Sequence, residues 1–410
     1  RMVALVRRGH SVENLAAITF TRKAAGEMTA RFYRELQRIA PKLDGREKKN
    51  VQTALRNLHG TYIGTIHGFC GRLLREHAMA AELPPDFSVG LEGRDEVEMR
   101  DRAWHEFLSE TYKARPELIE RLQGLGVELE ELGPFFETLC KYPELELYTD
   151  SPTDVPDLSD AVQEAKEVLE EWQPRRPDIP TKDRDDVQKA FDRAEAMLKH
   201  HALERPAQQA KFLGFFEGAY SDSKEPGEWG TGGGTLNRWN KQADVGPKVL
   251  KEEDLPRLVE EEIRPVLRPW QAHVHEALAE AVSPAVDMYR KMRKEEGRLT
   301  HHDVLLLTRN LLREDEEART RAQQSVSHLL VDEFQDTDPL QAQILFYLTS
   351  EDPTQDDWRK CVPRPGSLFI VGDDKQSIYR FRRADKAVFD EVATRLKELE
   401  QPHGEVVDLV

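Results

Sequence analysis

Short, mostly apolar runs alternate with amphipathic stretches near the start of the chain. Residues 16–20 and 61–66 are apolar runs of strand length, whereas 23–36 and 67–81 place apolar residues every three or four positions. The first pattern is typical of a buried strand and the second of a helix. Thr21 stands where a side chain caps the helix that follows. This alternation predicts a parallel α/β sheet.

The alternation returns in the last third of the chain, and the middle differs because helical periodicity dominates it. In the last third, the sequence predicts strands over 326–331, 367–371 and 406–410, and helices over 302–312, 339–348 and 384–399. In the middle, the clearest predicted helices cover 95–111 and 255–293.

Two stretches of the middle section break the helical pattern. Pro, Asp and Glu crowd 143–187, which predicts a loosely packed connection, and the Gly-rich stretch 221–234 predicts a surface loop. That loop lacks the Lys-Ser/Thr pair and the preceding strand that a phosphate-binding loop requires. We therefore expect an α/β domain split in sequence, residues 1–81 and 299–410, with a large and mainly helical insertion domain of residues 82–298.

Composition narrows the class of protein. A chain of 410 residues holds two or three domains at roughly 150 residues each. It has no apolar run of about 18 residues, so no membrane span is expected. Its three cysteines have no disulfide-framework or metal-ligand spacing, and the pairs His200-His201 and His301-His302 are interpreted as surface or packing residues. We expect a reducing, cytoplasmic location.

The charge is unevenly distributed along the chain. The net charge is −17, but residues 1–80 carry 15 Lys/Arg and 6 Asp/Glu, and residues 81–180 carry 10 Lys/Arg and 26 Asp/Glu. A local basic surface binds phosphate whatever the total charge. The acidic section is either a set of solvated helix faces or a surface that contacts a partner.

The most informative stretch follows a predicted strand and reads His328-Leu-Leu-Val-Asp-Glu-Phe-Gln-Asp-Thr337. Ligands of parallel sheets bind beyond the carboxyl ends of the strands, where Asp332 and Glu333 are expected to lie. A carboxylate ligand for Mg²⁺ and a carboxylate that orients water are the acidic groups that nucleotide hydrolysis needs. Adjacent acids after a strand also commonly cap the next helix, but Gln335 and Asp336 beside them favour the nucleotide site.

A second polar constellation follows the predicted strand 367–371 and spans residues 370–385. Gln376 both donates and accepts hydrogen bonds, so it is a candidate sensor of a terminal phosphate. Tyr379 and Phe381 alternate with arginines, Arg382 among them, which is typical of surfaces that stack bases and contact phosphates of single strands. The alternative is that both rings belong to the core.

Two strand–helix junctions in the basic section are weaker candidates. The first is Thr19-Phe-Thr-Arg-Lys23, where hydroxyls and free amides at a helix start favour phosphate oxygens and Phe20 is a candidate stacking ring. The second is Thr65-Ile-His67, in which the histidine alone favours a structural role across the turn.

These four blocks, in this order, resemble motifs Ia, Ic, II and III of the superfamily 1 DNA helicases of the UvrD, Rep and RecB type. The forms Thr65-Ile-His-Gly-Phe-Cys70 and Lys375-Gln-Ser-Ile-Tyr-Arg-Phe-Arg382 are more similar to the RecB/AddA branch, that of exonuclease V and the helicase–nucleases. Asp303 matches a further block of that branch. The resemblance covers about 1–80 and 297–390, and the middle is identified only by its position as the usual insertion.

The resemblance implies a RecA-like, parallel-sheet P-loop NTPase domain that uses ATP and Mg²⁺ to move 3′ to 5′ along single-stranded DNA in recombination and double-strand-break repair. Asp332 would hold Mg²⁺, Glu333 would activate water, and Gln335, Gln376 and Arg382 would complete the nucleotide side. The residues implied on the DNA side are Thr19, Phe20, Thr21, Lys23, Thr65, His67, Tyr379, Phe381 and Arg382. The implied partners are single-stranded and duplex DNA and a second helicase–nuclease subunit.

The family's phosphate loop has no counterpart in these residues and is expected just before residue 1. A second RecA-like domain is expected to begin near Val406, and nothing resembles a nuclease domain. We therefore expect the chain to be part of a longer, nucleoid-associated enzyme and to be inactive alone. A different class of protein stays open, namely a non-hydrolysing module that binds DNA or a partner.

Overall fold

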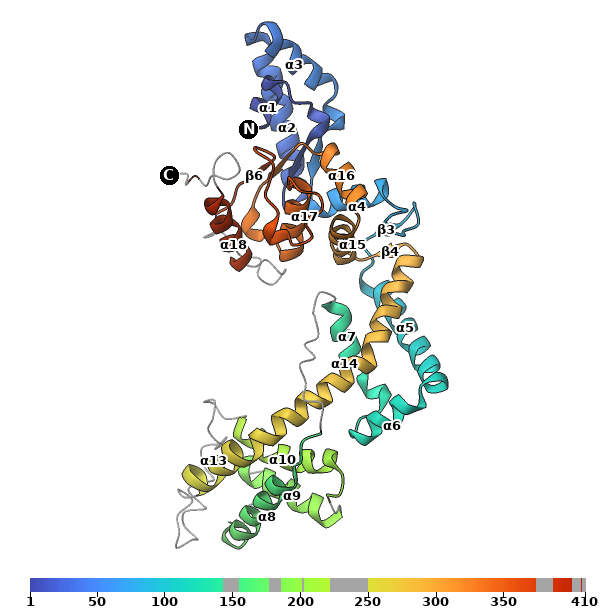
Figure 1. Ribbon diagram of the computed structural model, residues 1–410, viewed down its shortest axis with the longest axis vertical. Coiled ribbons are helices and arrows are strands. Elements are labelled where there is room, and N and C mark those ends of the chain that lie inside the picture. The colour runs from blue at the N-terminus through green and yellow to red at the C-terminus, as the bar shows by residue number, and fades with distance from the viewer. Residues whose placement is uncertain are drawn as a thin grey trace. The chain divides into compact units, whose positions relative to one another are not determined.

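A computed structural model describes residues 1–142, 155–176, 186–200, 203–221, 250–373, 386–399 and 407. The chain divides into two compact units (Figure 1). Unit 1 comprises Arg1–Met99 and Lys291–Val410, and unit 2 comprises Arg100–Arg290. Among the described residues, no helix combines the length and the apolar character needed to cross a membrane.

Unit 1 is built on a four-stranded parallel sheet in the order β2-β1-β5-β6. The strands are β1 (Leu15–Ile18), β2 (Tyr62–Gly64), β5 (His328–Val331) and β6 (Leu368–Ile370). In register, Ala17 pairs with Ile63 on one side and with Leu330 on the other, and Leu330 pairs with Phe369. The parallel sheet predicted from the sequence is confirmed, with each described strand shorter than its apolar run.

Alternate residues of β1 face two separate cores, because successive side chains of a strand point to opposite faces. Leu15 and Ala17 belong to a core with α1 (Met2–Arg8), α2 (Arg22–Ile39) and α3 (Gly45–Arg56). Ala16 and Ile18 belong to the larger core on the other face. That core includes residues of α4 (Ile66–Glu76), α15 (His301–Glu314), α16 (Glu316–Ser325), α17 (Pro339–Thr349) and α18 (Lys386–Glu398).

Several boundaries differ from the sequence predictions. The helix expected over 67–81 ends at Glu76, and α3 and α16 were not predicted. Only Val51 and Ala54 of α3 are buried, so its apolar signal is weak. Short 3-10 turns connect these elements at Val12–Asn14, Ala40–Lys42, Leu58–Gly60, Phe334–Asp336 and Trp358–Lys360. The strand expected over 406–410 lies outside the described residues, except for Val407.

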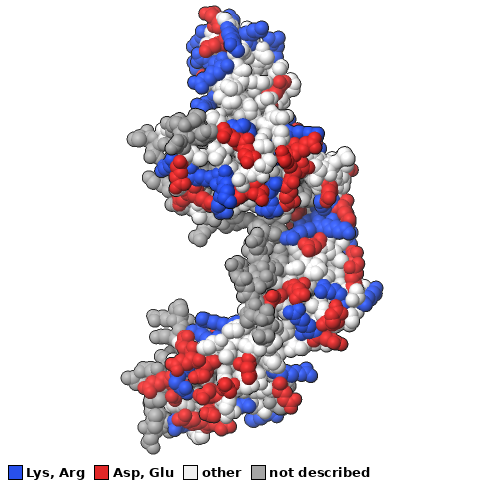
Figure 2. Space-filling model, in the orientation of Figure 1, with Lys and Arg blue, Asp and Glu red and all other residues white. Residues whose placement is uncertain are grey.

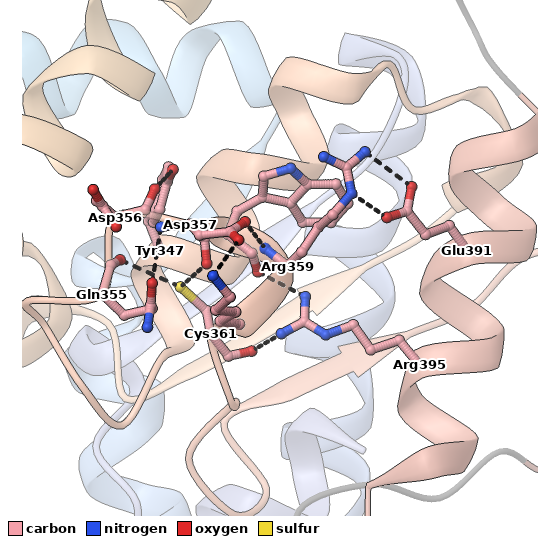
Figure 3. Close-up of polar contacts among 10 residues, drawn as sticks. Tyr347, Gln355, Asp356, Asp357, Arg359, Cys361, Glu391 and Arg395 are labelled. Atoms are coloured by element: carbon pink, nitrogen blue, oxygen red, sulfur yellow. Dashed lines mark hydrogen bonds and ion pairs between the residues drawn. The ribbon is translucent and has the colours of Figure 1, made fainter.

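Helix α18 is fixed to the loop that precedes β6. Arg395 donates to the carbonyl of Trp358 at 2.6 Å and to that of Cys361 (Figure 3). Arg359, from the same loop, forms an ion pair with Glu391 at 2.5 Å. Both contacts join α18 to the same loop. The helix is therefore attached to the rest of unit 1 by polar contacts as well as by its apolar face.

A second, two-stranded parallel sheet in unit 1 joins β3 (Ser88–Val89) to β4 (Arg298–Leu299). Lys294 pairs with Glu82 at 2.6 Å beside it. Residues near the two ends of the predicted insertion, 82–298, therefore contact each other in unit 1. The unit boundaries fall inside α5 (Gly93–Ala114) and α14 (Arg264–Glu295).

Unit 2 is helical in all of its described elements. Besides parts of α5 and α14, it contains α6 (Pro116–Gly124), α7 (Gly133–Lys141), α8 (Ser159–Trp172), α9 (Asp186–His200), α10 (Pro206–Ser221) and α13 (Leu255–Arg257). Short 3-10 turns lie at Leu129–Leu132 and Gln173–Arg175. A π-helical segment at Leu258–Ile263 interrupts the helix expected over 255–293, and another at Leu250–Asp254 precedes it.

One region of unit 2 contradicts the sequence prediction. The stretch 143–187 was expected to be a loosely packed connection, yet α8 within it buries Leu169 and Trp172 in the core of the unit. Trp172 also donates to Asp254 at 2.9 Å. The predicted loop 221–234 lies outside the described residues beyond Ser221, the last residue of α10.

Candidate functional site

The carboxyl ends of the four parallel strands meet at one edge of the unit 1 sheet, and the polar residues after them are linked through the backbone. The amide of Thr19, after β1, donates to the carbonyl of Gly64 at 3.0 Å. The amide of Asp332, after β5, donates to Ile18 O at 2.9 Å, and that of Phe334 donates to Val371 O at 3.0 Å. The predicted blocks that follow these strands therefore begin at this shared edge.

Asp332 is half-buried at this edge and Glu333 is exposed. Burial, and then the neighbouring charge of Glu333, raises the pKa of Asp332 above its usual value. The same two causes raise the pKa of Asp336. Glu333 has φ 56° and ψ 43°, a left-handed conformation that costs a non-glycine residue about 1–2 kcal/mol. The carboxylates are therefore held close together in spite of repulsion and backbone strain.

Gln335 connects the acid pair to the neighbouring strand. It is 2% exposed, and its amide nitrogen donates to Glu333 Oε2 at 2.6 Å. Its amide oxygen accepts from the backbone N–H of Asp373, just after β6, at 3.0 Å. A Cβ on Gly372 would lie 2.9 Å from that oxygen, so only glycine fits there without a shift. The side chain thus fixes the Glu333 carboxylate relative to the backbone of Asp373.

A cavity of about 330 Å³ opens at the same edge, and its walls come from three of the predicted blocks. It is lined by Phe20, His67, Asp332, Glu333 and Asp336, among others. His301, interpreted from the sequence as a surface or packing residue, also lines it. The ring of His301 lies edge-on to that of His67, with centroids 5.3 Å apart.

His67 is held in the neutral form. Burial, and then the charges of His301 and His302, lowers the pKa of His67 to about 4. A neutral imidazole donates one hydrogen bond and accepts one. His67 is therefore suited to hydrogen bonding or ring stacking at neutral pH, and it adds no positive charge.

A second cavity, of about 470 Å³, lies beside Asp332 between α1, α2 and the ends of β5 and β6. Its walls include Met28, Phe32 and Phe369, with Arg31 and Glu27 at its polar side. Asp332 therefore lines both cavities.

The remaining predicted residues differ in accessibility. Thr21 caps α2 by accepting from Ala24 N at 3.0 Å, and Thr65 caps α4 by accepting from Gly68 N at 3.3 Å. Lys23 is exposed in the first turn of α2. Thr19 is 1% exposed and its hydroxyl has no hydrogen-bond partner among the described residues, and the residue lines the 330 Å³ cavity. Its contact with DNA stays a prediction. Gln376, Tyr379, Phe381 and Arg382 lie outside the described residues.

Charged side chains are distributed differently over the two units. Figure 2 shows Lys and Arg gathered over α1–α3 of unit 1, and Asp and Glu gathered over α8 and the segments on either side of α13 in unit 2. The basic surface lies in the unit that contains the predicted motifs, as the uneven charge of the sequence indicated.

Comparison with known proteins identifies the family. The model of the UvrD/REP helicase N-terminal domain matches residues 1–397. The chain belongs to this UvrD/REP helicase family. It is 24% identical to the A subunit of the ATP-dependent helicase/nuclease of Ligilactobacillus salivarius, over 95% of this chain and 33% of the relative. The same subunit from Pediococcus pentosaceus is 23% identical over 99% of the chain and 34% of the relative.

This UvrD/REP helicase chain thus spans about a third of the length of the curated relatives that it matches. The resemblance to this family was based on four short blocks of sequence. The family model and the relatives extend it, at low identity, through the helical middle, which carries no recognised motif. The helicase/nuclease names of these relatives also agree with the predicted RecB/AddA branch.

Proposed function

We propose that this chain is the nucleotide- and single-strand-binding part of an ATP-dependent DNA helicase that acts in recombination and double-strand-break repair. The observation that carries the proposal is the meeting of the acid pair, Phe20 and His67 around one cavity at the carboxyl edge of a parallel sheet. The name of the relatives, an ATP-dependent helicase/nuclease, supports the same class of activity.

The nucleotide side of the proposal rests on Asp332 and Glu333. Mg²⁺ is usually bound through one or two carboxylates, with phosphates and water completing its shell. The described residues contain no group of three metal-ligating side chains, and a single carboxylate at a sheet edge fits that pattern. Asp332 would hold the ion, which when bound would neutralise charge on the phosphates. Glu333, fixed by Gln335, would orient and deprotonate the attacking water.

The DNA side rests on groups around the same cavity. Phe20 would stack on a base, at about 1–3 kcal/mol per base. Thr21 and Lys23 at the start of α2, and Thr65 at the start of α4, would contact phosphates, because free amides at a helix start favour anions. His67 would contact the strand as a neutral ring. Tyr379, Phe381, Gln376 and Arg382 are proposed for the same surface from the motif alone.

The decisive experiment replaces Glu333 with Gln in the protein as its gene encodes it and measures ATP hydrolysis with and without single-stranded DNA. Loss of a positioned general base costs about 10²–10⁴-fold in rate, so DNA-stimulated hydrolysis should be lost. Glu98→Gln, an exposed substitution of the same type on α5, is the control. Undiminished turnover in Glu333→Gln refutes the proposed role. Single-strand binding without any hydrolysis in the wild type would instead favour the non-hydrolysing module.

We further propose 3′-to-5′ movement and, for the partner, a second helicase–nuclease subunit. Movement is tested by displacement of streptavidin from oligonucleotides biotinylated at one end. Faster displacement from the 5′ end is expected, and faster displacement from the 3′ end contradicts the polarity. The acidic surface of unit 2 favours a protein partner over duplex DNA, because like charges repel. Loss of the copurifying partner on neutralising Glu164, Glu167 and Glu171 would support this assignment, whereas unchanged copurification would contradict it.

A further inference from the structure

The side chain of Tyr62 joins β2 to the start of α4. Its side chain runs forward along the strand, and its hydroxyl donates to the carbonyl of Thr65 at 2.7 Å. That carbonyl also accepts from Phe69 N at 3.0 Å, which is the first hydrogen bond of α4. The Tyr62 ring packs edge-on against Phe69, with centroids 5.2 Å apart. The residue therefore fixes the strand-to-helix turn through both a polar and an aromatic contact.

Two glycines make room for this side chain. A Cβ on Gly64 would lie 2.5 Å from the Tyr62 hydroxyl oxygen and 2.7 Å from ring atom Cζ. A Cβ on Gly68 would lie 2.7 Å from the same oxygen but 3.9 Å from Cζ, which is an ordinary contact. Neither glycine has a positive φ, so space is what these positions require rather than backbone freedom. The clash at Gly68 comes from the hydroxyl, whereas the clash at Gly64 also involves the ring.

The turn that Tyr62 holds forms part of the sheet edge described above. Gly64 O accepts from the amide of Thr19, so β2 and β1 end in register. Ile66 and His67, directly after the turn, line the 330 Å³ cavity together with Phe20 and Asp332. A shift of the turn therefore moves His67 relative to the opposite wall. Burial raises the pKa of Tyr62, so its hydroxyl remains a donor across the neutral range.

We propose that Tyr62 is a positioning residue for single-stranded DNA, which sets the Thr65–His67 turn by filling the space left by Gly64 and Gly68. The proposal rests on the proposed function, because it assigns Thr65 and His67 to the DNA-binding edge. Tyr62 itself does not line the cavity, so it acts only through the turn. The geometry makes the three residues dependent on one another, so substitutions at them should not have additive effects.

The test is a double-substitution cycle in the protein as its gene encodes it. Gly68→Ala places a methyl group against the Tyr62 hydroxyl and should weaken binding of a fluorescent oligothymidylate by about tenfold, which corresponds to about 1.4 kcal/mol. Tyr62→Phe alone removes one hydrogen bond and should weaken binding by about two- to fivefold. The combination removes the oxygen that the new methyl group meets. It should therefore bind as well as Tyr62→Phe alone and more tightly than Gly68→Ala.

Gly64→Ala is the matched control, because the ring carbon at 2.7 Å remains when the hydroxyl is removed. Tyr62→Phe should leave the defect of Gly64→Ala unrelieved. Affinity is measured by anisotropy at one low salt concentration, since phosphate contacts weaken as salt rises. Thermal unfolding of each variant is measured in parallel, and affinities are compared well below every midpoint.

The outcomes separate the two proposals. Recovery of affinity in Tyr62→Phe/Gly68→Ala, but not in Tyr62→Phe/Gly64→Ala, supports the positioning role. Recovery of the unfolding midpoint with oligonucleotide affinity equal in all variants overturns it, because the contact is then structural only. Additive effects on affinity also overturn it. A wild-type chain that binds no oligonucleotide overturns the proposed DNA-binding edge itself, and the positioning role with it.

Discussion

Gln335 offers the most direct test of how the acid pair is held. Its buried amide joins Glu333, at 2.6 Å, to the backbone N–H of Asp373, at 3.0 Å. A hydrogen bond to a charged group contributes about 1.5–3 kcal/mol, and one between neutral groups about 0.5–1.5 kcal/mol. Glu333 and Asp373 are both exposed and recover water when the amide is removed, so the low end applies. Gln335→Leu should therefore destabilise unit 1 by about 2 kcal/mol.

Gln335→Glu makes a different prediction at the same position. It keeps an oxygen for the Asp373 N–H but places a second carboxylate against Glu333. Two carboxylates that close cannot both ionise, so the pKa of one of them rises in the folded state. A raised pKa means that the folded state holds its proton more tightly than the unfolded state, so the penalty is largest at neutral pH. Gln335→Glu should be the less stable variant at neutral pH and should gain on Gln335→Leu as the pH falls.

The assay must report on unit 1 alone. Trp358 is the only tryptophan in residues 1–99 and 291–410, so the ¹⁹F signal of 5-fluorotryptophan at that position follows this unit. For a unit of about 200 residues, 2 kcal/mol corresponds to a midpoint lower by about 4–8 °C.

The control is Gln37→Leu, which removes an exposed contact between neutral groups within α2, to the hydroxyl of Tyr33 at 2.8 Å. It should cost less than about 1 kcal/mol. Equal losses for Gln335→Leu and Gln37→Leu, or a Gln335→Glu penalty that is constant with pH, would refute the bridging role.

Three further predictions concern unit 1. Burial and Glu333 raise the pKa of Asp332, so its ionised form lowers the stability of the folded state. Asp332→Asn should therefore raise the unfolding midpoint at neutral pH, and this gain should be lost as the pH falls through the raised pKa. A gain that is constant with pH would contradict this. Arg293 holds Asp303 through two hydrogen bonds of 2.7 Å, and although burial raises the pKa of Asp303, Arg293 lowers it overall. Arg293→Met should lower the free energy of unfolding in urea by about 3–5 kcal/mol at neutral pH, and by less as the pH falls through the lowered pKa of Asp303. A loss below about 1 kcal/mol would contradict the pairing. Thr21→Ala should cost about 1 kcal/mol by losing the cap of α2, measured by circular dichroism, and Thr21→Ser should retain the cap.

The parts of the fold that could be predicted from the sequence are those with a strong local signal. Strands β1 and β5 are apolar runs bounded by polar residues, and α15 begins at a Thr300–Asp303 capping box. Helix α8 was not predicted because the Pro, Asp and Glu residues of 143–187 obscure the spacing of its apolar residues. Its buried residues recur with helical period: Ala161, Val162, Ala165, Val168, Leu169 and Trp172.

The candidate site was predictable to the extent that sheet topology determines it. Parallel strands bring their carboxyl ends to one edge, so Asp332 and the segment after the predicted strand 367–371 were expected at the ligand-binding edge from topology alone. The bridge made by Gln335, the contact of His67 with His301 and the fit of Tyr62 over Gly64 depend on the packing of side chains around the sheet. No periodicity in the sequence encodes those contacts.

Several unfavourable features of unit 1 lie together at that same edge. Glu333 has a left-handed backbone, the pKa of Asp332 is raised, and Thr19 Oγ1 and Asp336 Oδ1 are buried with no hydrogen-bond partner among the described residues. At the opposite edge, Arg364 donates to the carbonyls of Leu348 and Ser350, so those backbone groups are paired. Strain and unpaired polar groups persist where the surrounding structure holds them, and they are common at binding and catalytic sites. Such features also occur elsewhere in unit 1, since Thr61 Oγ1 and Asn310 Oδ1 are buried without a partner among the described residues and Glu82 has a positive φ. What distinguishes the carboxyl edge is that strain, raised pKa values and unpaired groups coincide there around one cavity. This coincidence supports that edge as the working surface of the unit, independently of the motifs.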